Sequence, residues 1–365
     1  MIVASPCCGC RPESGSGGER YESRILAGLV RVGVDPHVQL VQGKRYPLDL
    51  FGHVESFWSP LPLRWWAMPF LMAQRIGACW RDHEFDVLRV HSATFLGPAA
   101  LIARRRYGIT APVVVQVHHW EPAPGLRWLE RRVLRQADRV IVDSQFVRQQ
   151  VLAQGVPADR IRVVYCGADQ PVPATLPPAS VRATYGVPIS APLILSLGPC
   201  IPRKDPLGLL RIFRMTAQYA PDAHLVWCGD GPLRRRALTW AEGMGLADRV
   251  HFPGFVPESD KRALLATATV FAFTSRLEGC PLAVLEAMAA GLPVVAWRAA
   301  SLPELLGDGA GCLATTATEF STDLAILIQQ RRTREGLNRR AMEVVAERFT
   351  WARAVEGVRA ALTFT

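Results

Sequence analysis

The sequence predicts an α/β protein of two doubly wound domains, each a parallel β-sheet covered by helices. Three observations lead to this prediction. The chain has 365 residues, which at about 150 residues per domain suggests two domains. Short apolar runs rich in β-branched residues alternate with longer helical patterns, as in βαβ units. This alternation stops at a Pro-rich stretch, 171–178, and then restarts.

Each expected strand is a short apolar run bounded by turn residues or by a helical pattern. In the first half these runs lie at 2–4, 38–41, 87–90, 113–117, 140–142 and 161–164. In the second half they lie at 193–197, 225–227, 250–252, 270–273 and 294–296. Parallel sheets bind ligands outside the carboxyl ends of their strands. We therefore expect two Rossmann-like domains, 1–172 and 173–350, facing a central cleft that holds the ligands.

The composition and charge exclude several classes of protein. Hydrophobic residues make up 49% and charged residues 20% of the chain, which excludes a disordered chain or a coiled coil. The net charge of +10 is spread along the sequence. A spread excess favours anionic partners, such as phosphorylated ligands or an anionic membrane surface, and argues against a nucleic-acid-binding arm.

The cysteines and the N-terminus predict a cytoplasmic protein. Most of the nine cysteines stand singly in apolar runs, as reduced, buried thiols do. Cys7, Cys8 and Cys10 could suggest zinc, but no second Cys/His pair follows at a usual spacing, so no metal is expected. The apolar N-terminal run is too short for a signal peptide, and no apolar run reaches the roughly 20 residues of a membrane span.

A Trp-rich stretch, 57–80, departs from the alternating pattern and has two interpretations. Its tryptophans are interspersed with Arg64, Arg75 and Arg81, a composition that suits a membrane interface. With the arginines at 104–106 and 131–132, it would dock the protein peripherally on the inner face of the membrane. Alternatively, the stretch is a core helix that buries Trp65, Trp66 and Phe70 under the first sheet.

The sharpest motif runs from Ser275 to Val295. A strand ends near Thr274, a loop carries Glu278, and a helix starts at Pro281, where a missing N–H costs nothing. Gly291 ends this helix. The unpaired amides at the helix start suit a phosphate; they belong to Gly279, Cys280, Leu282 and Ala283.

Two carboxylates frame this expected anion site. Side chains lean toward the N-terminus of a helix, so Glu286 can point back toward the site that Glu278 borders. A carboxylate accepts two hydroxyl hydrogen bonds, and the pair therefore suits the diols of a ribose and of a sugar on either side of a diphosphate. The alternative for Glu286 is a solvated helix position, which its apolar neighbours disfavour.

The spacing Glu278-x7-Glu286, with Gly-x-Pro-Leu and Glu-Ala-Met-Ala-x-Gly-x-Pro-Val-Val, resembles the donor site of GT-B retaining glycosyltransferases of family 4, the glycosyltransferases group 1. The resemblance covers nearly the whole chain and is strongest from 137 to 310. Further stretches that resemble the family, in its order, are 137–147, 161–169, 197–198, 203–204, 227–232, 250–255 and 302–305.

The resemblance implies roles in the second domain. Glu278 would hold the donor sugar hydroxyls and Glu286 the nucleotide ribose. Lys204 and the backbone of four residues would hold the diphosphate; these are Gly279, Cys280, Pro281 and Leu282. The family usually has an Arg where this chain has Pro199. Either Arg203 substitutes for it, or stabilisation of the diphosphate is weaker.

The resemblance also implies roles in the first domain. Gly17 and Gly18 match the family's Gly-Gly loop, and Arg20 would face an anionic acceptor. The alternative there is an ordinary tight turn. His118 ends a predicted strand and matches the family histidine near the transferred sugar, with adjacent His119 or a structural histidine as alternatives. A final helix over 351–365 would cross back to the first domain.

The implied activity is transfer of a sugar from a nucleotide-diphosphate sugar to a hydroxyl acceptor with retention, in polysaccharide or glycoconjugate biosynthesis. The catalytic residues would be Glu278, His118 and Lys204. No Asp-x-Asp occurs, so neither a metal nor another cofactor is expected. The acceptor would be lipid-linked if the protein docks on the membrane. Two alternatives are a non-catalytic sugar-nucleotide-binding subunit and a sugar-nucleotide epimerase or hydrolase on the same fold.

Overall fold

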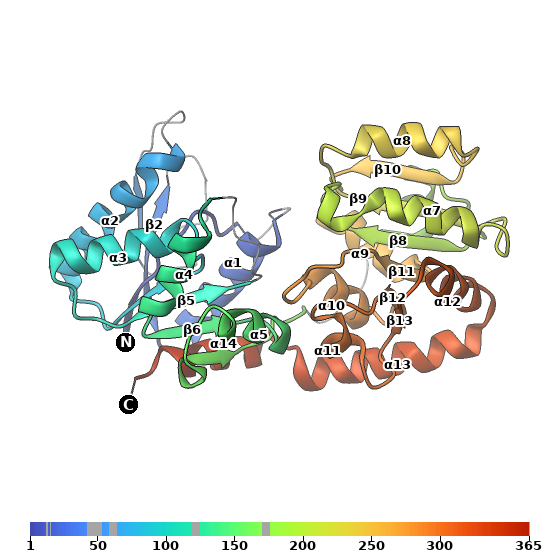
Figure 1. Ribbon diagram of the computed structural model, residues 1–365. Coiled ribbons are helices and arrows are strands. Elements are labelled where there is room, and N and C mark those ends of the chain that lie inside the picture. The colour runs from blue at the N-terminus through green and yellow to red at the C-terminus, as the bar shows by residue number, and fades with distance from the viewer. Residues whose placement is uncertain are drawn as a thin grey trace. The chain divides into compact units, whose positions relative to one another are not determined.

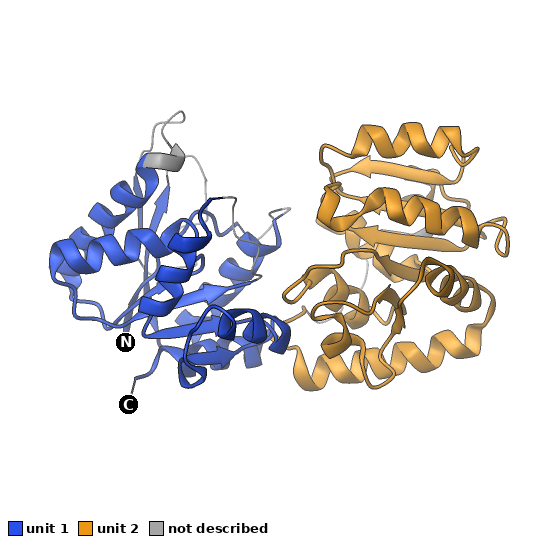
Figure 2. Cartoon of the chain, viewed as in Figure 1, with its two compact units in different colours: residues 1–166, 351–365 blue, residues 167–350 orange. Residues whose placement is uncertain are grey.

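The computed structural model describes residues 1–11, 14, 16–41, 53–57, 64–118, 125–169 and 176–364, without the side chains of 64–66 and 178. The chain forms two compact units (Figure 2). Unit 1 comprises residues 1–166 and 351–365, and unit 2 comprises residues 167–350. The sequence placed the first boundary at 172, within a stretch, 170–175, that lies outside the described residues.

Unit 1 contains a parallel sheet with the strand order β3-β2-β1-β4-β5-β6-β7 (Figure 1). Its strands are β1 Ile2–Ala4, β2 Asp35–Val41, β3 His53–Phe57, β4 Val87–Val90, β5 Val113–Val117, β6 Arg139–Val142 and β7 Ile161–Val163. Its helices are α1 Gly17–Arg31, α2 Arg64–His83, α3 Leu96–Tyr107, α4 Arg127–Gln136, α5 Gln145–Leu152 and α14 Trp351–Leu362, with a 3₁₀ turn at Ala158–Arg160.

Unit 2 repeats this plan with the order β10-β9-β8-β11-β12-β13, again all parallel. Its strands are β8 Leu193–Leu197, β9 His224–Cys228, β10 Val250–Gly254, β11 Val270–Phe273, β12 Val294–Trp297 and β13 Cys312–Ala314. Its helices are α6 Pro178–Thr184, α7 Pro206–Thr216, α8 Arg234–Gly243, α9 Glu258–Thr267, α10 Leu282–Ala289, α11 Leu302–Leu306, α12 Ala317–Gln329 and α13 Arg331–Arg348, with a 3₁₀ turn at Pro202–Lys204.

The predicted α/β class and every predicted strand are confirmed, with strand ends within three residues of those expected. The sequence missed β3 and β13, which are edge strands of the two sheets. An edge strand covers less of the core, so its apolar pattern is weak, and in β3 only Phe57 is buried.

The cores lie between each sheet and the helices that cover it. In unit 1 the four central strands are almost entirely buried, and α2 adds Met68, Met72 and Ile76 to the same core. In unit 2, Phe213, Trp227 and other apolar side chains from the sheet and its helices fill the core. All nine cysteines are described and all are free thiols, seven of them buried, which agrees with the thiol state expected from the sequence.

The C-terminal helix α14 completes unit 1 rather than unit 2. It packs against α1 and β6. A Cβ on Gly28 of α1 would overlap the side chain of Val355, so a glycine is required for this close approach. Arg139 at the start of β6 donates hydrogen bonds to the carbonyls of Ala361 and Thr363, which fixes the end of the chain.

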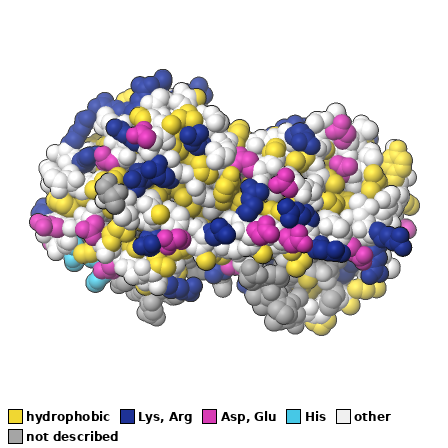
Figure 3. Space-filling model, turned by 90° about the horizontal axis from the view of Figure 1, so that it is seen from below, with side chains coloured by type: hydrophobic (Ala, Val, Ile, Leu, Met, Phe, Trp, Pro, Cys, Tyr) yellow, Lys and Arg dark blue, Asp and Glu magenta, His cyan; other side chains and the backbone are white. Residues whose placement is uncertain are grey.

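The surface carries its charge in a dispersed form. On the face that Figure 3 shows, Lys and Arg side chains are scattered among Asp, Glu and apolar side chains. Across the described part of the chain, no helix is both long enough and apolar enough to cross a membrane.

Candidate functional site

In unit 2 the strand order reverses between β8 and β11, and ligands of such sheets bind beyond the carboxyl ends of the strands at this point. The segment after β8 carries Arg203 and Lys204, and the segment after β11 carries Glu278. The structure brings these three residues into direct contact. Three of the predicted donor-site residues therefore meet where the fold favours a ligand.

Glu278 is the centre of this group and is only 7% exposed. Its Oε1 accepts three hydrogen bonds, from Lys204 Nζ at 2.7 Å, Arg203 Nη1 at 2.7 Å and Ser275 Oγ at 2.6 Å. No residue of the described ranges donates to its second oxygen, Oε2. Burial alone would raise the pKa of Glu278, but the two cations outweigh burial and hold the pKa below its usual value. The carboxylate is therefore ionised and keeps one oxygen for another donor.

Lys204 is held by its backbone as well as by its ammonium group. Its carbonyl accepts a hydrogen bond of 2.9 Å from the Thr274 hydroxyl, and its Nζ lies 4.9 Å from the ring centroid of Phe273. Burial lowers the pKa of Lys204, and the charge of Glu278 opposes that effect. The lysine is thus fixed on a short 3₁₀ turn with its charge directed at Glu278.

Arg203 lies beside Lys204, while Pro199 occupies the position where the resemblance leads one to expect an Arg. Besides its bond to Glu278, Arg203 donates through Nη1 to the Leu277 carbonyl at 3.1 Å. Its backbone carbonyl accepts a hydrogen bond of 3.0 Å from Ser275 Oγ. A second cation besides Lys204 therefore contacts Glu278, although Pro199 stands where an Arg is expected.

The helix that follows, α10, begins one residue later than the sequence predicted. Pro281 is its N-cap in an extended conformation and Leu282 its first residue, so the prediction that Pro281 starts the helix is wrong. The first hydrogen bonds of the helix run from Val284 and Leu285 to the Pro281 carbonyl. The amides of Leu282 and Ala283 come before these two residues. Like the first amides of any helix, they have no carbonyl acceptor within the helix. Gly291, with φ of +67°, follows the end of the helix as expected.

Glu286 lies one turn into α10 and has a partner that the sequence analysis missed. Lys261 of α9 donates to its Oε1 at 3.1 Å and also pairs with Glu258 at 2.8 Å. The side chains of Lys261 and Glu286 are only 12% and 14% exposed, so the alternative of a solvated Glu286 is wrong. The composition could have pointed to Lys261, because only three of the 42 Lys and Arg residues are lysines. Two of these three pair with Glu278 and Glu286.

In unit 1, His118 follows β5 and pairs with Asp143 at the end of β6, at 2.6 Å. Its Nε2 is buried and has no hydrogen-bond partner among the described residues. Burial lowers the pKa of His118, but Asp143 outweighs burial, and the net shift is upward. Asp143 thus stabilises the charged form of the ring, and Nε2 is left without a partner among the described residues. His119 lies outside the described residues.

Behind His118 lies a buried polar network. Arg89 of β4 donates to both oxygens of Glu22, at 2.5 and 2.9 Å, and to Gln116 at 2.6 Å. Gln116 in turn donates to the Tyr21 hydroxyl at 2.6 Å. The Tyr21 ring lies edge-on to His118, with centroids 4.8 Å apart. The network connects α1 to β4 and β5 and supports the histidine.

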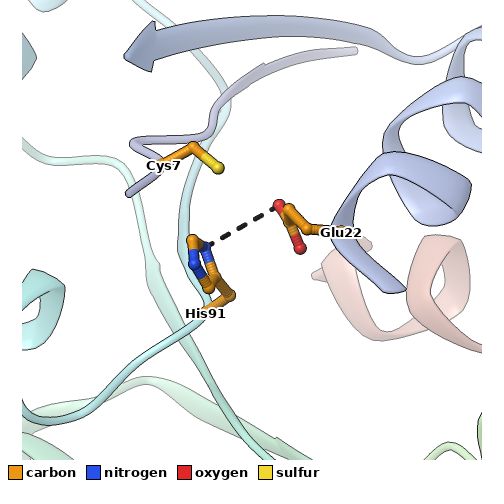
Figure 4. A group of neighbouring side chains, drawn as sticks. All are labelled: Cys7, Glu22 and His91. Carbon is orange, nitrogen blue, oxygen red and sulfur yellow. Dashed lines mark ion pairs between the residues drawn. The ribbon is translucent and has the colours of Figure 1, made fainter. Parts of the chain in front are cut away.

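Cys7, Glu22 and His91 converge beside this network (Figure 4). His91 Nδ1 lies 3.9 Å from Glu22 Oε1, but both oxygens of Glu22 already bind Arg89. Burial raises the pKa of the Cys7 thiol well above its usual value and lowers that of His91 to about 4. A neutral thiol beside a carboxylate that already has a cation disfavours a metal here.

Gly17 and Gly18 are the first two residues of α1, so the prediction of a loop that ends before the helix is wrong at this point. Both are exposed, and Arg20 is half-buried in the same turn. Ser16 is the N-cap, in an extended conformation. The two glycines thus leave the N-terminus of α1 uncovered by side chains of its first two residues.

Comparison with known proteins decides the family. Residues 15–170 match the family model described as Glycosyltransferase Family 4, and residues 181–344 match the model described as Glycosyl transferases group 1. The chain belongs to the group 1 glycosyltransferases. Every predicted site residue lies within one of the two matched regions of this glycosyltransferase.

Relatives and solved structures agree with this assignment. The chain is 29% identical over 253 residues to GDP-mannose-dependent alpha-(1-6)-phosphatidylinositol monomannoside mannosyltransferase of Mycolicibacterium smegmatis, covering 65% of each chain. It is 29% identical to MMP alpha-(1->4)-mannosyltransferase of Mycolicibacterium hassiacum, covering 87% of this chain and 84% of the relative. HepE of Anabaena, solved in complex with UDP, superposes over 99% of both chains with a TM-score of 0.79 at 21% identity, which shows the GT-B fold.

Proposed function

We propose that the protein transfers a sugar from a nucleotide-diphosphate sugar to a hydroxyl acceptor, with retention at the anomeric carbon. The observation that carries the proposal is the contact of Lys204 and Arg203 with buried Glu278 at the reversal of the unit 2 sheet. Two cations beside the start of α10 suit a diphosphate, and the second oxygen of Glu278 suits a sugar hydroxyl.

In the proposed reaction, the bond between the anomeric carbon and the diphosphate oxygen breaks while the acceptor oxygen bonds to the same face of that carbon. The departing diphosphate takes the proton of the acceptor hydroxyl, so no protein nucleophile is required. Lys204 and the first amides of α10 stabilise the charge that develops on the diphosphate. In unit 1, His118 is proposed to hydrogen-bond through Nε2 to a hydroxyl of the transferred sugar. Arg20, with Gly17 and Gly18 at the start of α1, is proposed to serve the acceptor.

The nucleotide is proposed to bind through Glu286, whose carboxylate Lys261 holds in place. Glu286→Ala is expected to weaken nucleotide binding about 10- to 100-fold, since a charged hydrogen bond contributes about 1.5–3 kcal/mol. Glu278→Ala is expected to lower kcat more than it lowers nucleotide affinity. Isothermal titration with nucleotide and steady-state kinetics measure the two effects, with Glu335→Ala on the exposed face of α13 as the control. Wild-type affinity and rate in both variants would refute the two roles.

Product formation from radiolabelled donors distinguishes this proposal from its alternatives. The panel should include GDP-mannose and UDP-glucose, because one relative is named for the first and HepE was solved with the second. Transfer to an acceptor supports the proposal. Binding without turnover would identify a non-catalytic sugar-nucleotide-binding subunit, and release of free or epimerised sugar would identify a hydrolase or an epimerase.

We also propose that transfer needs no metal, with Lys204 and the α10 amides in the place of a divalent cation. Transfer is therefore expected to keep its rate in excess EDTA. Comparing initial rates with and without EDTA checks this expectation. Loss of transfer in EDTA that Mn²⁺ restores would show that a metal takes part.

The acceptor is proposed to be lipid-linked and reached by peripheral docking of unit 1 on anionic membrane. Helix α4 supports this: Trp128 is 64% exposed, and its helix lines a groove of about 630 Å³ with four arginines, Arg127, Arg131, Arg132 and Arg135.

In the Trp-rich stretch, Phe70 is 62% exposed, so the prediction that buries it under the sheet is wrong. The side chains of Trp65 and Trp66 lie outside the described residues.

Docking is expected to require anionic lipid and to weaken with salt. Because each cation near the surface contributes about 1 kcal/mol, Arg127→Ala/Arg132→Ala should weaken vesicle binding about 30-fold. Co-sedimentation with phosphatidylserine vesicles measures this, and the control is Arg331→Ala/Arg332→Ala on α13. No binding to anionic vesicles at low salt would leave the acceptor as a soluble molecule.

A further inference from the structure

A cluster of imidazoles lies at the amino ends of β2 and β3. It is away from the strand ends that carry His118 and the buried polar network of Arg89, Glu22 and Gln116. It comprises His37 of β2, His53 of β3 and His83 at the end of α2. The ring centroid of His37 lies 4.4 Å from that of His53 and 4.3 Å from that of His83. Nothing in the proposed transfer reaction uses these residues.

The parallel register creates the cluster. His37 is the direct partner of His53 in the β2–β3 pair, so their side chains leave the same face of the sheet. Asp35 is two residues before His37 on the same strand and therefore shares that face. Helix α2 packs against β2 and brings His83 to the same place. Three segments far apart in the sequence thus present nitrogen and oxygen ligands together.

The distances between these groups suit a small cation. The ligand atoms of Asp35, His37 and His53 lie within 4.8 Å of one another, and Asp35 Oδ2 is 3.4 Å from the Nε2 of His37. In a tetrahedral zinc site with bonds of about 2.0–2.1 Å, neighbouring ligand atoms are about 3.4 Å apart. One pair of atoms already has this separation, and the exposed side chain of His53 needs only a small movement to reach it.

Burial and charge distinguish this cluster from ordinary surface histidines. The His37 side chain is 5% exposed, so its ring is fixed by the surrounding fold, whereas Asp35 is 44% exposed and accessible from solvent. Unlike Glu22 in the Cys7 group, Asp35 has no Arg or Lys partner among the described residues. A divalent cation would supply the missing positive charge, and the Asp35 and His53 side chains that would bind it are exposed.

We propose that Asp35, His37 and His53 form a Zn²⁺ site in which the metal fastens edge strand β3 to β2. Two neutral imidazoles and a carboxylate are borderline ligands that Zn²⁺ accepts, and the fourth position faces His83 or a water. The site is structural and separate from the metal-free transfer reaction, since it lies at the opposite ends of the strands.

The test is titration of the untagged, chelator-treated full chain with Zn²⁺ alone. We expect one equivalent to bind and the Tm to rise. Removing a group that only supports a metal ligand already lowers metal affinity about 10- to 100-fold. Because His53 and Asp35 are proposed as direct ligands, His53→Ala and Asp35→Asn should each weaken Zn²⁺ binding by about 100-fold or more and abolish the rise in Tm. Both positions are exposed enough for the variants to fold. The matched control is His251→Ala, which alters the stacked His224–His251 pair of unit 2.

A second measurement separates this site from the cysteines. Co²⁺ in place of Zn²⁺ should give a spectrum without the thiolate charge-transfer band that a site including Cys7 would produce. The proposal is overturned if His53→Ala and Asp35→Asn bind Zn²⁺ as the wild type does, or if the thiolate band appears in the stoichiometric complex. Transfer activity is no part of either readout, so the result is independent of the proposed function.

Discussion

Replacing Lys204 by methionine is expected to lower kcat by about 100- to 1,000-fold, the loss seen when one preorganised charge-stabilising donor is removed from an active site. Methionine keeps the length of the side chain and removes the charge. Glu278 keeps its hydrogen bonds from Arg203 and Ser275, so the site should remain folded. Nucleotide affinity should fall less than kcat, because charge on the diphosphate grows in the transition state.

Steady-state kinetics with the donor that supports transfer measures the effect of Lys204→Met, and equilibrium titration measures nucleotide affinity. Arg331→Met is the control, because Arg331 is 82% exposed and its pair with Glu335 lies on the surface. A kcat within threefold of the wild type would show that Lys204 does not stabilise the departing diphosphate. Arg203→Met separately tests whether Arg203 compensates for Pro199. If it does, this variant also has a lower kcat than the wild type.

Replacing Arg89 by methionine is expected to lower the free energy of unfolding of unit 1 by about 3–5 kcal/mol. Arg89 and Glu22 are both fully buried, and removal of one partner leaves the other charge buried without compensation. Arg89→Met/Glu22→Leu should recover much of this loss, because an apolar pair of similar size carries no desolvation cost. Chemical denaturation monitors the change, and equal stability of Arg89→Met and wild type would contradict it.

The same ion pair predicts a dependence of stability on pH. Burial raises the pKa of Glu22, but Arg89 outweighs it and holds the pKa at about 2 in the folded protein. A carboxylate whose pKa is lowered by folding stabilises the protein fully above its unfolded pKa, near 4.5. That contribution of about 3 kcal/mol is lost as the pH falls from 4.5 toward 2. Denaturation series across this range should show the loss in wild type and not in Arg89→Met/Glu22→Leu.

Much of the fold is determined by local patterns in the sequence. The central strands are continuous apolar runs because both of their faces are covered by helices. Their positions could therefore be predicted from the order of apolar residues along the chain. The family resemblance predicts a final helix over 351–365, and α14 occupies Trp351–Leu362 of that range. The two carboxylates of the candidate donor site could also be predicted locally, because Glu278 and Glu286 are separated by one loop and one helix turn. The role of Lys204 is implied by the family resemblance.

Tertiary structure alone decided the features that depend on pairing between distant segments. Lys261 reaches Glu286 across 25 positions, Arg89 reaches Glu22 across 67, and β3 exists because β2 offers it hydrogen bonds. None of these leaves a periodic signal, since a single buried charge or a polar edge strand resembles a solvated one in sequence. The starts of α1 and α10 differ from prediction because N-cap conformation depends on the surrounding loops. The histidine cluster likewise arises only when parallel register places His37 beside His53.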